Sequence, residues 1–264
     1  MEIIRWPQLE GTKGMAPLKE RFEQFMLSEK GVESIDRLME QCDLPDRKRA
    51  DYLAFDRCAI VEQKSLDVDP VDKIQKFINE HLNGRPIGDC GQTSLEDLLN
   101  QCPDGVALSN KLYANLTIRL DKILSCADKQ TRDTKRTFVN PYAVGIVVIL
   151  NDNAQVLQPD IVLTKAFKML RKQENGEIRY PHNHVVILIS EAHRIVSDPE
   201  LDLIPMETIY SDAGNAIPIA TKFADHLKSR WAEFNGALYV DSAAHWRDVR
   251  TRDPAKVFNV QRAR

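Results

Sequence analysis

The chain has 264 residues, 43% of them hydrophobic, which is enough for one large domain or two small ones around a sizeable core. Its net charge of −3 and isoelectric point near 6.1 exclude a surface that is positive all over, so any nucleic-acid contact requires a local basic groove. The five cysteines include no Cys-x-x-Cys pair and fit neither a disulfide framework nor a structural zinc site.

The sequence predicts a cytoplasmic protein that does not insert into membranes. The amino terminus lacks a basic start followed by an apolar run, so no secretory signal is expected. The longest apolar stretch, residues 143–150, is far too short to span a bilayer. The cysteine usage favours a reducing compartment.

The first third of the chain predicts a helix, a hairpin and a second helix. Apolar residues recur near helical spacing over 17–42, with a break expected at Gly31. Two strands follow, over about 50–55 and 58–66. Residues 70–81 predict the next helix, with Asp69 as its N-cap and a proline in its first turn.

The rest of the chain predicts a helical insertion and then an α/β half. Helices are expected at 93–99 and 106–124, within an insertion over about 85–136. Continuous apolar strands at 143–150 and 184–190, with an amphipathic helix at 160–172 between them, are typical of a sheet covered on both faces. A last helix is expected over 223–234. The prediction is thus a single α/β domain over 1–264, with a core motif over about 30–80, a second α/β half over about 138–240 and an arginine-rich tail over 247–264.

Charged residues stand at an unexpected place in the predicted hairpin. Pairing across a loop at residues 56–57 puts Asp51 directly opposite Glu62, and the alternation of side chains puts Lys64 on the same face. Opposed carboxylates at the edge of an apolar surface are costly, and a divalent cation removes their repulsion. Hard oxygen ligands on one side, with open positions for water and phosphate, suit Mg²⁺ or Mn²⁺.

This hairpin resembles the catalytic motif of the PD-(D/E)xK, or restriction-endonuclease-like, nuclease superfamily. Asp51 stands eleven residues before the Glu62-Gln63-Lys64 run on a second strand, with a helix before and another after. Ala50 stands where the motif has proline. The resemblance implies a restriction-endonuclease-like core, a central mixed sheet flanked by helices. It also implies a Mg²⁺- or Mn²⁺-dependent enzyme that hydrolyses phosphodiester bonds, with DNA as the expected substrate.

The same resemblance implies roles for individual residues. Asp51 and Glu62 would ligate the metal, and the backbone carbonyl of Gln63 would add a ligand. Lys64 would orient the attacking water or help to deprotonate it. Glu33 is the candidate for a further acid from the first core helix.

A basic stretch supplies candidate contacts to the phosphate backbone. The run KQTRDTKR over 129–136 lies between a predicted helix and a predicted strand, and a solvated loop is its alternative interpretation. The candidate residues are Lys129, Arg132, Lys135 and Arg136. Nucleic acid is therefore the expected partner, and a homodimer is left open.

Two alternatives remain open at this point. In the first, the chain is a catalytically inactive relative, a nucleic-acid- or protein-binding module in which Asp51, Glu62 and Lys64 merely pair. In the second, the chain is a small-molecule- or partner-binding α/β protein whose site lies in the second half from Ala143, near Glu191 and His193 at the end of a buried strand. The His-Asn-His run at 182–184 reads as a turn into that strand rather than as an HNH nuclease motif.

Overall fold

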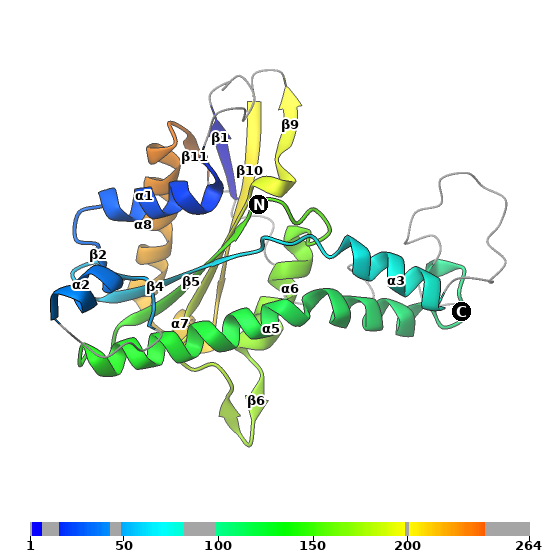
Figure 1. Ribbon diagram of the computed structural model, residues 1–264, viewed down its shortest axis with the longest axis horizontal. Coiled ribbons are helices and arrows are strands. Elements are labelled where there is room, and N and C mark those ends of the chain that lie inside the picture. The colour runs from blue at the N-terminus through cyan, green and yellow to red at the C-terminus, as the bar shows by residue number, and fades with distance from the viewer. Residues whose placement is uncertain (1, 7–15, 43–48, 82–98, 199–200, 241–264) are drawn as a thin grey trace.

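The computed structural model describes residues 2–6, 16–42, 49–81, 99–198 and 201–240, which form an α/β fold around one large mixed sheet (Figure 1). Within these ranges nine strands run in the order β11-β1-β10-β8-β5-β4-β3-β2, with β9 paired to β10. Their bounds are β1 Glu2–Trp6, β2 Glu33–Ser34, β3 Tyr52–Ala54, β4 Ala59–Ser65, β5 Val144–Asn151, β8 Val185–Ser190, β9 Ile195–Asp198, β10 Leu201–Tyr210 and β11 Leu238–Val240. A separate small hairpin, β6 Gln173–Glu174 with β7 Glu177–Ile178, projects below the body in Figure 1.

Helices cover both faces of the sheet. They are α1 Leu18–Ser28, α2 Ile35–Cys42, α3 Val71–His81, α5 Gly105–Thr137, α6 Pro159–Leu170, α7 Asp212–Asn215 and α8 Pro218–Phe234, with a short 3-10 helix η1 over Glu191–His193. The central strands β4, β5 and β8 are parallel, and β3 and β10 flank them in antiparallel pairs. The continuous apolar strands predicted for both-sided burial are confirmed, since every residue of β5 and β8 is buried.

The two cores follow the alternation of side chains along the strands. Val147 and Ile149 of β5 face the core under α5 and α6, whereas Ile146 and Val148 face the core under α1 and α8. In the second core Trp231 of α8 lies 5.5 Å from the ring of Phe22 and, edge-on, 5.5 Å from that of Phe25. These contacts hold α1 and α8 together on their face of the sheet.

Helix α5 has 33 residues, more than the sequence pattern predicted. At 1.5 Å per residue it is about 50 Å long. It continues through residues 129–136, so the basic stretch is helical and not a loop between elements. The buried residues of α5 include several leucines before residue 128 and are Asp128, Thr131, Thr134 and Lys135 from there on. Because these four are polar, the pattern of apolar residues does not show that the helix continues.

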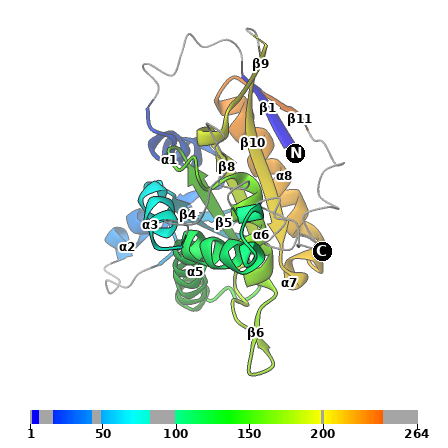
Figure 2. The ribbon, with the colours of Figure 1, turned by 90° about the vertical axis from the view of Figure 1, so that its right-hand side faces the viewer.

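The segment predicted as an insertion therefore has two parts that the structure describes. The C-terminal part of α5 covers one face of the sheet, and the N-terminal part extends beyond the sheet together with α3 (Figure 1). Figure 2 looks nearly along α5 and shows α3 beside it. The helix expected at 93–99 falls almost wholly on residues outside the described ranges, and the arginine-rich tail over 247–264 lies outside them entirely.

Several local predictions can be compared with the structure. The break at Gly31 is confirmed, because this glycine has a φ of +78° and separates α1 from β2 and α2. Asp69 was a predicted N-cap, but its carboxylate accepts hydrogen bonds from the backbone N–H groups of Gln155 and Val156. Among the described residues no helix has both the length and the hydropathy needed to cross a bilayer.

Gly145→Ala is expected to destabilise the fold by at least about 2 kcal/mol. A Cβ at Gly145 would overlap the backbone carbonyl oxygen of His182 and lie 2.9 Å from Thr131 Cγ2, and neither the strand nor the carbonyl can move cheaply. Gly176→Ala is the control, because a Cβ there meets none of the described residues within 4 Å and the cost is only that of a φ of +83°. Urea denaturation of the two variants gives the comparison, and equal losses would contradict the close approach at Gly145.

Candidate active site

The hairpin of β3 and β4 has the predicted register. Tyr52 pairs with Val61, Leu53 with Ile60 and Ala54 with Ala59. Asp51 directly precedes β3, and continuing this register by one pair places it opposite Glu62. The turn occupies residues 55–58 and leaves the pairing unchanged, as expected for a loop of two or four residues.

Two backbone contacts fix Asp51. Its Oδ2 accepts a hydrogen bond of 2.6 Å from the backbone N–H of Gln63, and its carbonyl accepts one of 2.9 Å from the N–H of Ile35 at the start of α2. Burial raises the pKa of the Asp51 carboxyl, while the Gln63 N–H and the charge of Lys64 act in the opposite direction. The side chain is therefore held against β4 in one orientation.

Glu62 lies in the middle of a buried strand and has no exposed surface. Its Oε1 forms an ion pair with Lys64 Nζ, and its Oε2 accepts no hydrogen bond within the described part of the chain. Burial, followed by the nearby charge of Asp51, raises the pKa of Glu62 to about 8, although Lys64 and Gln130 oppose the shift. A buried carboxylate oxygen without a donor is a costly feature that a cation would relieve.

Helix α5 supplies a contact that the sequence pattern did not indicate. Lys64 Nζ donates to Gln130 Oε1 at 2.9 Å, and Gln130 Nε2 donates to the carbonyl of Arg49 at 2.7 Å. One turn further on, Thr134 Oγ1 accepts from the backbone N–H of Ala50 at 3.0 Å. The helix thus holds both Lys64 and the segment that leads into Asp51.

The donors present fit a divalent cation. Asp51 and Glu62 supply carboxylate oxygens, which Mg²⁺ and Mn²⁺ prefer. The N–H and C=O of one strand residue point to the same side, so the Gln63 carbonyl faces the same side as its N–H, which bonds to Asp51. Among the described residues no group of three or more His, Cys, Asp or Glu side chains converges, so water and phosphate oxygens would complete the coordination.

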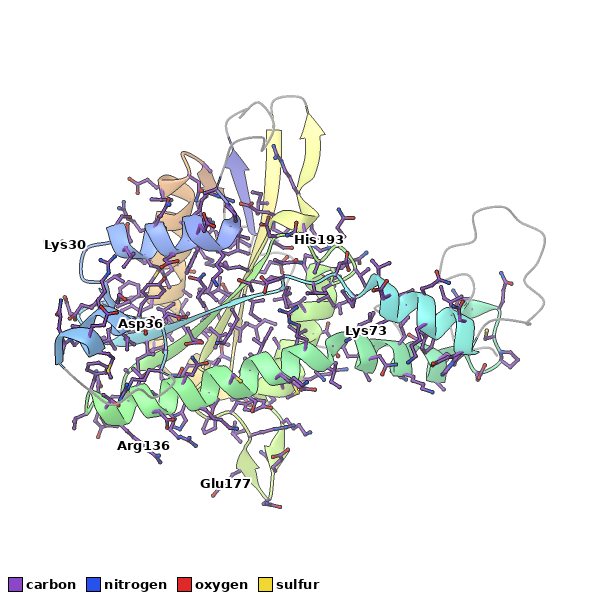
Figure 3. The ribbon with its side chains drawn as sticks, in the orientation of Figure 1. Lys30, Asp36, Lys73, Arg136, Glu177 and His193 are labelled. Atoms are coloured by element: carbon purple, nitrogen blue, oxygen red, sulfur yellow. The ribbon has the colours of Figure 1, made fainter. Side chains whose placement is uncertain are left out.

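Glu33 is not brought to this pair. It lies on strand β2 and not on a helix, and its carboxylate accepts two hydrogen bonds of 2.7 Å from the guanidinium of Arg57. That hydrogen bonding lowers the pKa of Glu33. Asp36 of α2, labelled in Figure 3, is instead near enough for its charge to raise the pKa of Asp51, behind burial as the main cause.

The four predicted phosphate contacts do not share one surface. Lys129 and Arg136 are exposed, whereas Lys135 is 7% exposed and faces the core side of α5. Burial lowers the pKa of Lys135. Arg132 makes an ion pair with Asp133. Only Lys129 and Arg136 of this group remain candidates for a phosphate backbone.

The turn at 182–184 makes structural contacts. His184 Nδ1 accepts from the Gly145 N–H, and Asn183 Nδ2 donates to the carbonyl of Leu124. Burial lowers the pKa of His184 to about 4, so the ring is neutral near pH 7. These bonds join α5, β5 and β8, as a turn into the strand requires.

The rival site in the second half consists of side chains with partners. Glu191 pairs with the buried guanidinium of Arg21. One ring nitrogen of His193, labelled in Figure 3, lies 2.7 Å from Ser190 Oγ and the other 2.8 Å from the carbonyl of Gln155. This arrangement joins η1 to neighbouring loops.

No family model, curated protein or solved structure matches this chain.

Proposed function

We propose that the protein is a metal-dependent nuclease that hydrolyses phosphodiester bonds, with DNA as its substrate. The observation that carries this proposal is Glu62, a fully buried carboxylate whose Oε2 meets no donor within hydrogen-bond distance among the described residues, set opposite Asp51 and beside Lys64. These groups are not explained by stability alone. The free energy needed to bury a carboxylate exceeds the stabilisation that one ion pair provides.

The residues have separate roles in the proposed reaction. Asp51 and Glu62 would hold Mg²⁺ or Mn²⁺, with the Gln63 carbonyl as a further ligand. The bound cation would polarise a phosphate oxygen and lower the pKa of the attacking water. Lys64, held by Gln130, would orient that water and stabilise negative charge that develops on the phosphate. The water oxygen forms the new bond to phosphorus as the bond to the leaving sugar oxygen breaks.

The free thiols of Cys58, Cys102 and Cys126 are compatible with the cytoplasmic location that we propose together with this function.

Loss of either acid is expected to abolish most cleavage. Asp51→Asn and Glu62→Gln should each cut plasmid or oligonucleotide DNA at least about a hundredfold more slowly in Mg²⁺, because each removes a charged oxygen ligand. Glu33→Gln is the matched control, since its carboxylate pairs with Arg57 away from the two acids, and it should cleave at the wild-type rate. Chelation by EDTA should stop cleavage by the wild type.

The outcome also separates the nuclease from its inactive alternative. Undiminished cleavage by Asp51→Asn would reject the proposed site. A wild-type chain that binds DNA but neither cleaves it nor binds Mn²⁺ by calorimetry would instead be a binding module, in which the Glu62–Lys64 ion pair is purely structural.

A further inference from the structure

The outer face of α5 carries three cations at regular spacing. Lys122, Lys129 and Arg136 are seven residues apart, so they fall on one side of the helix. At 1.5 Å per residue they are about 10 Å apart and extend over about 21 Å. All three side chains are exposed. We call these three residues the basic ridge.

The charges of the basic ridge are not neutralised locally. Within the described part of the chain none of the three makes an ion pair, whereas the neighbouring acids have other partners: Asp133 pairs with Arg132, and Asp121 with Lys165. The charge of Arg136 also affects His182. The pKa of His182 is lowered first by burial and then by the charges of Lys135, Arg132 and Arg136, against the opposing charge of Asp128. The charge of Arg136 therefore acts on His182, where the opposing charge of Asp128 outweighs that of any single cation.

The basic ridge lies on the same helix as a residue that contacts the candidate active site. Lys129 directly precedes Gln130, the residue that accepts the hydrogen bond from Lys64. Figure 3 shows the labelled Arg136 at the C-terminal end of α5, below the helix, and the labelled Asp36 above it. The ridge and the candidate site thus lie on different sides of α5, and a strand bound to the ridge must pass around the helix to reach the site.

The loop that leaves α5 adds an aromatic surface. Tyr142 is 90% exposed and Val139 is 84% exposed. Val139 also has a φ of +50°, a strained conformation for a β-branched residue and one that is typical of functional segments. Exposed aromatic rings next to cations are the usual means of holding unpaired bases.

We propose that the basic ridge and Tyr142 bind the sugar–phosphate backbone of a nucleic-acid strand, with an unpaired base stacked on Tyr142. This inference rests on the proposed nuclease function, because its ligand is the class of substrate proposed for that function. Binding through phosphates is independent of base sequence and weakens as salt rises. The ridge replaces the four-residue set predicted from the sequence, of which Lys135 is buried.

Binding is tested separately from cleavage, in EDTA and in a Glu62→Gln background. A labelled single-stranded oligonucleotide and its duplex are titrated by fluorescence anisotropy at several salt concentrations. The triple variant Lys122→Gln, Lys129→Gln, Arg136→Gln should bind the single strand at least about tenfold more weakly, and the slope of log Kd against log salt should fall by about 2. The control replaces three exposed lysines elsewhere, Lys30 in the turn after α1, Lys76 on α3 and Lys222 on α8, and should bind as the parent does.

Tyr142→Ala and the thiol of Cys126 provide two further readouts. Tyr142→Ala should weaken binding of the single strand about tenfold and leave duplex binding unchanged, because only unpaired bases can stack. Cys126 is exposed on α5 between Lys122 and Lys129, so bound oligonucleotide should slow its alkylation, whereas exposed Cys58 in the β3–β4 turn should react at the same rate.

The outcomes distinguish this inference from the proposed function. The proposal that the basic ridge binds nucleic acid would be contradicted if the triple variant and the control set bound equally well. It would also be contradicted if the parent bound neither oligonucleotide. Full affinity of Tyr142→Ala for the single strand would overturn the stacking contact. Ridge-dependent binding by a wild-type chain that cleaves nothing in Mg²⁺ or Mn²⁺ would support the ridge and reject the nuclease.

Discussion

Glu62→Gln is expected to make the metal-free protein more stable at pH 9 and to leave its stability near pH 4 almost unchanged. Folding raises the pKa of Glu62 from 4.5 to about 8. Between these values the folded state retains a proton that the unfolded state has lost, so the free energy of unfolding of the wild type decreases as the pH rises through this window. The shift lowers the free energy of unfolding of the wild type at pH 9 by as much as about 5 kcal/mol relative to its value near pH 4. Glutamine cannot ionise and escapes this cost.

Urea denaturation in EDTA at pH 4, 6, 8 and 9 measures this effect. Glu33→Gln is a control of opposite sign, because the Arg57 guanidinium lowers the pKa of Glu33. The stability that Glu33 contributes is present above its unfolded pKa and is lost as the pH falls through its folded pKa. Equal stability of Glu62→Gln and wild type at pH 9 would contradict the buried, poorly partnered carboxylate described above.

At high pH, Mn²⁺ should make the wild type more stable than Glu62→Gln, the reverse of the order expected without metal. A cation that binds only the folded state stabilises it by mass action, and here it would also favour the ionised form of Glu62. Saturating Mn²⁺ should therefore raise the wild-type denaturation midpoint at pH 8–9 and leave that of Glu62→Gln nearly unchanged. Equal responses of the two chains would place the cation elsewhere.

Lys64→Ala is expected to lower the rate of cleavage by about a hundredfold to ten-thousandfold, the contribution typical of a positioned group that acts on the attacking water. Its loss also removes the positive charge beside Glu62, so the pKa of Glu62 should rise further and weaken metal binding near neutral pH. The rate must therefore be compared at saturating Mn²⁺ and at pH 9, because both conditions favour the ionised form of Glu62. A normal rate under these conditions would show that Lys64 only assists metal binding.

Gln130→Leu tests the positioning of Lys64 by α5. The variant keeps the charge of Lys64 but removes the acceptor of its 2.9 Å hydrogen bond and the donor to the Arg49 carbonyl. We expect a smaller fall in kcat than in Lys64→Ala, with KM for DNA unchanged, and Gln130→Glu should retain more activity because it keeps an acceptor for Lys64. Lys73→Ala, an exposed lysine of α3 that is labelled in Figure 3, is the control and should leave kcat unchanged.

The register of the hairpin could be predicted because it depends on local rules. Side chains alternate along a strand and a short loop restricts the pairing, so Asp51 opposite Glu62 follows from the positions of the apolar residues. The buried strands β5 and β8 were equally evident as continuous apolar runs. These are properties of a few neighbouring residues.

Other parts of the site depend on contacts between distant segments. Gln130 is 66 residues from Lys64, and nothing in its surroundings along the chain distinguishes it from another helical glutamine. The sequence around Lys135 predicts an exposed lysine, but the packing of α5 against the sheet buries it. Glu33 was expected on a helix, but Gly31 ends α1 and the residue pairs with β3. The short strands β1 and β11, which extend the sheet beyond β10, come from opposite ends of the described chain and pair only in the tertiary structure.

The sequence by itself determined the α/β class, the hairpin and the face that Asp51, Glu62 and Lys64 share, because strand periodicity and turn geometry act over a few residues. Only the tertiary structure decided how deeply Glu62 is buried, which residue holds Lys64 and which cations of α5 face solvent. Burial and long-range hydrogen bonds arise when a 33-residue helix packs across the strands, and no local pattern reports that packing.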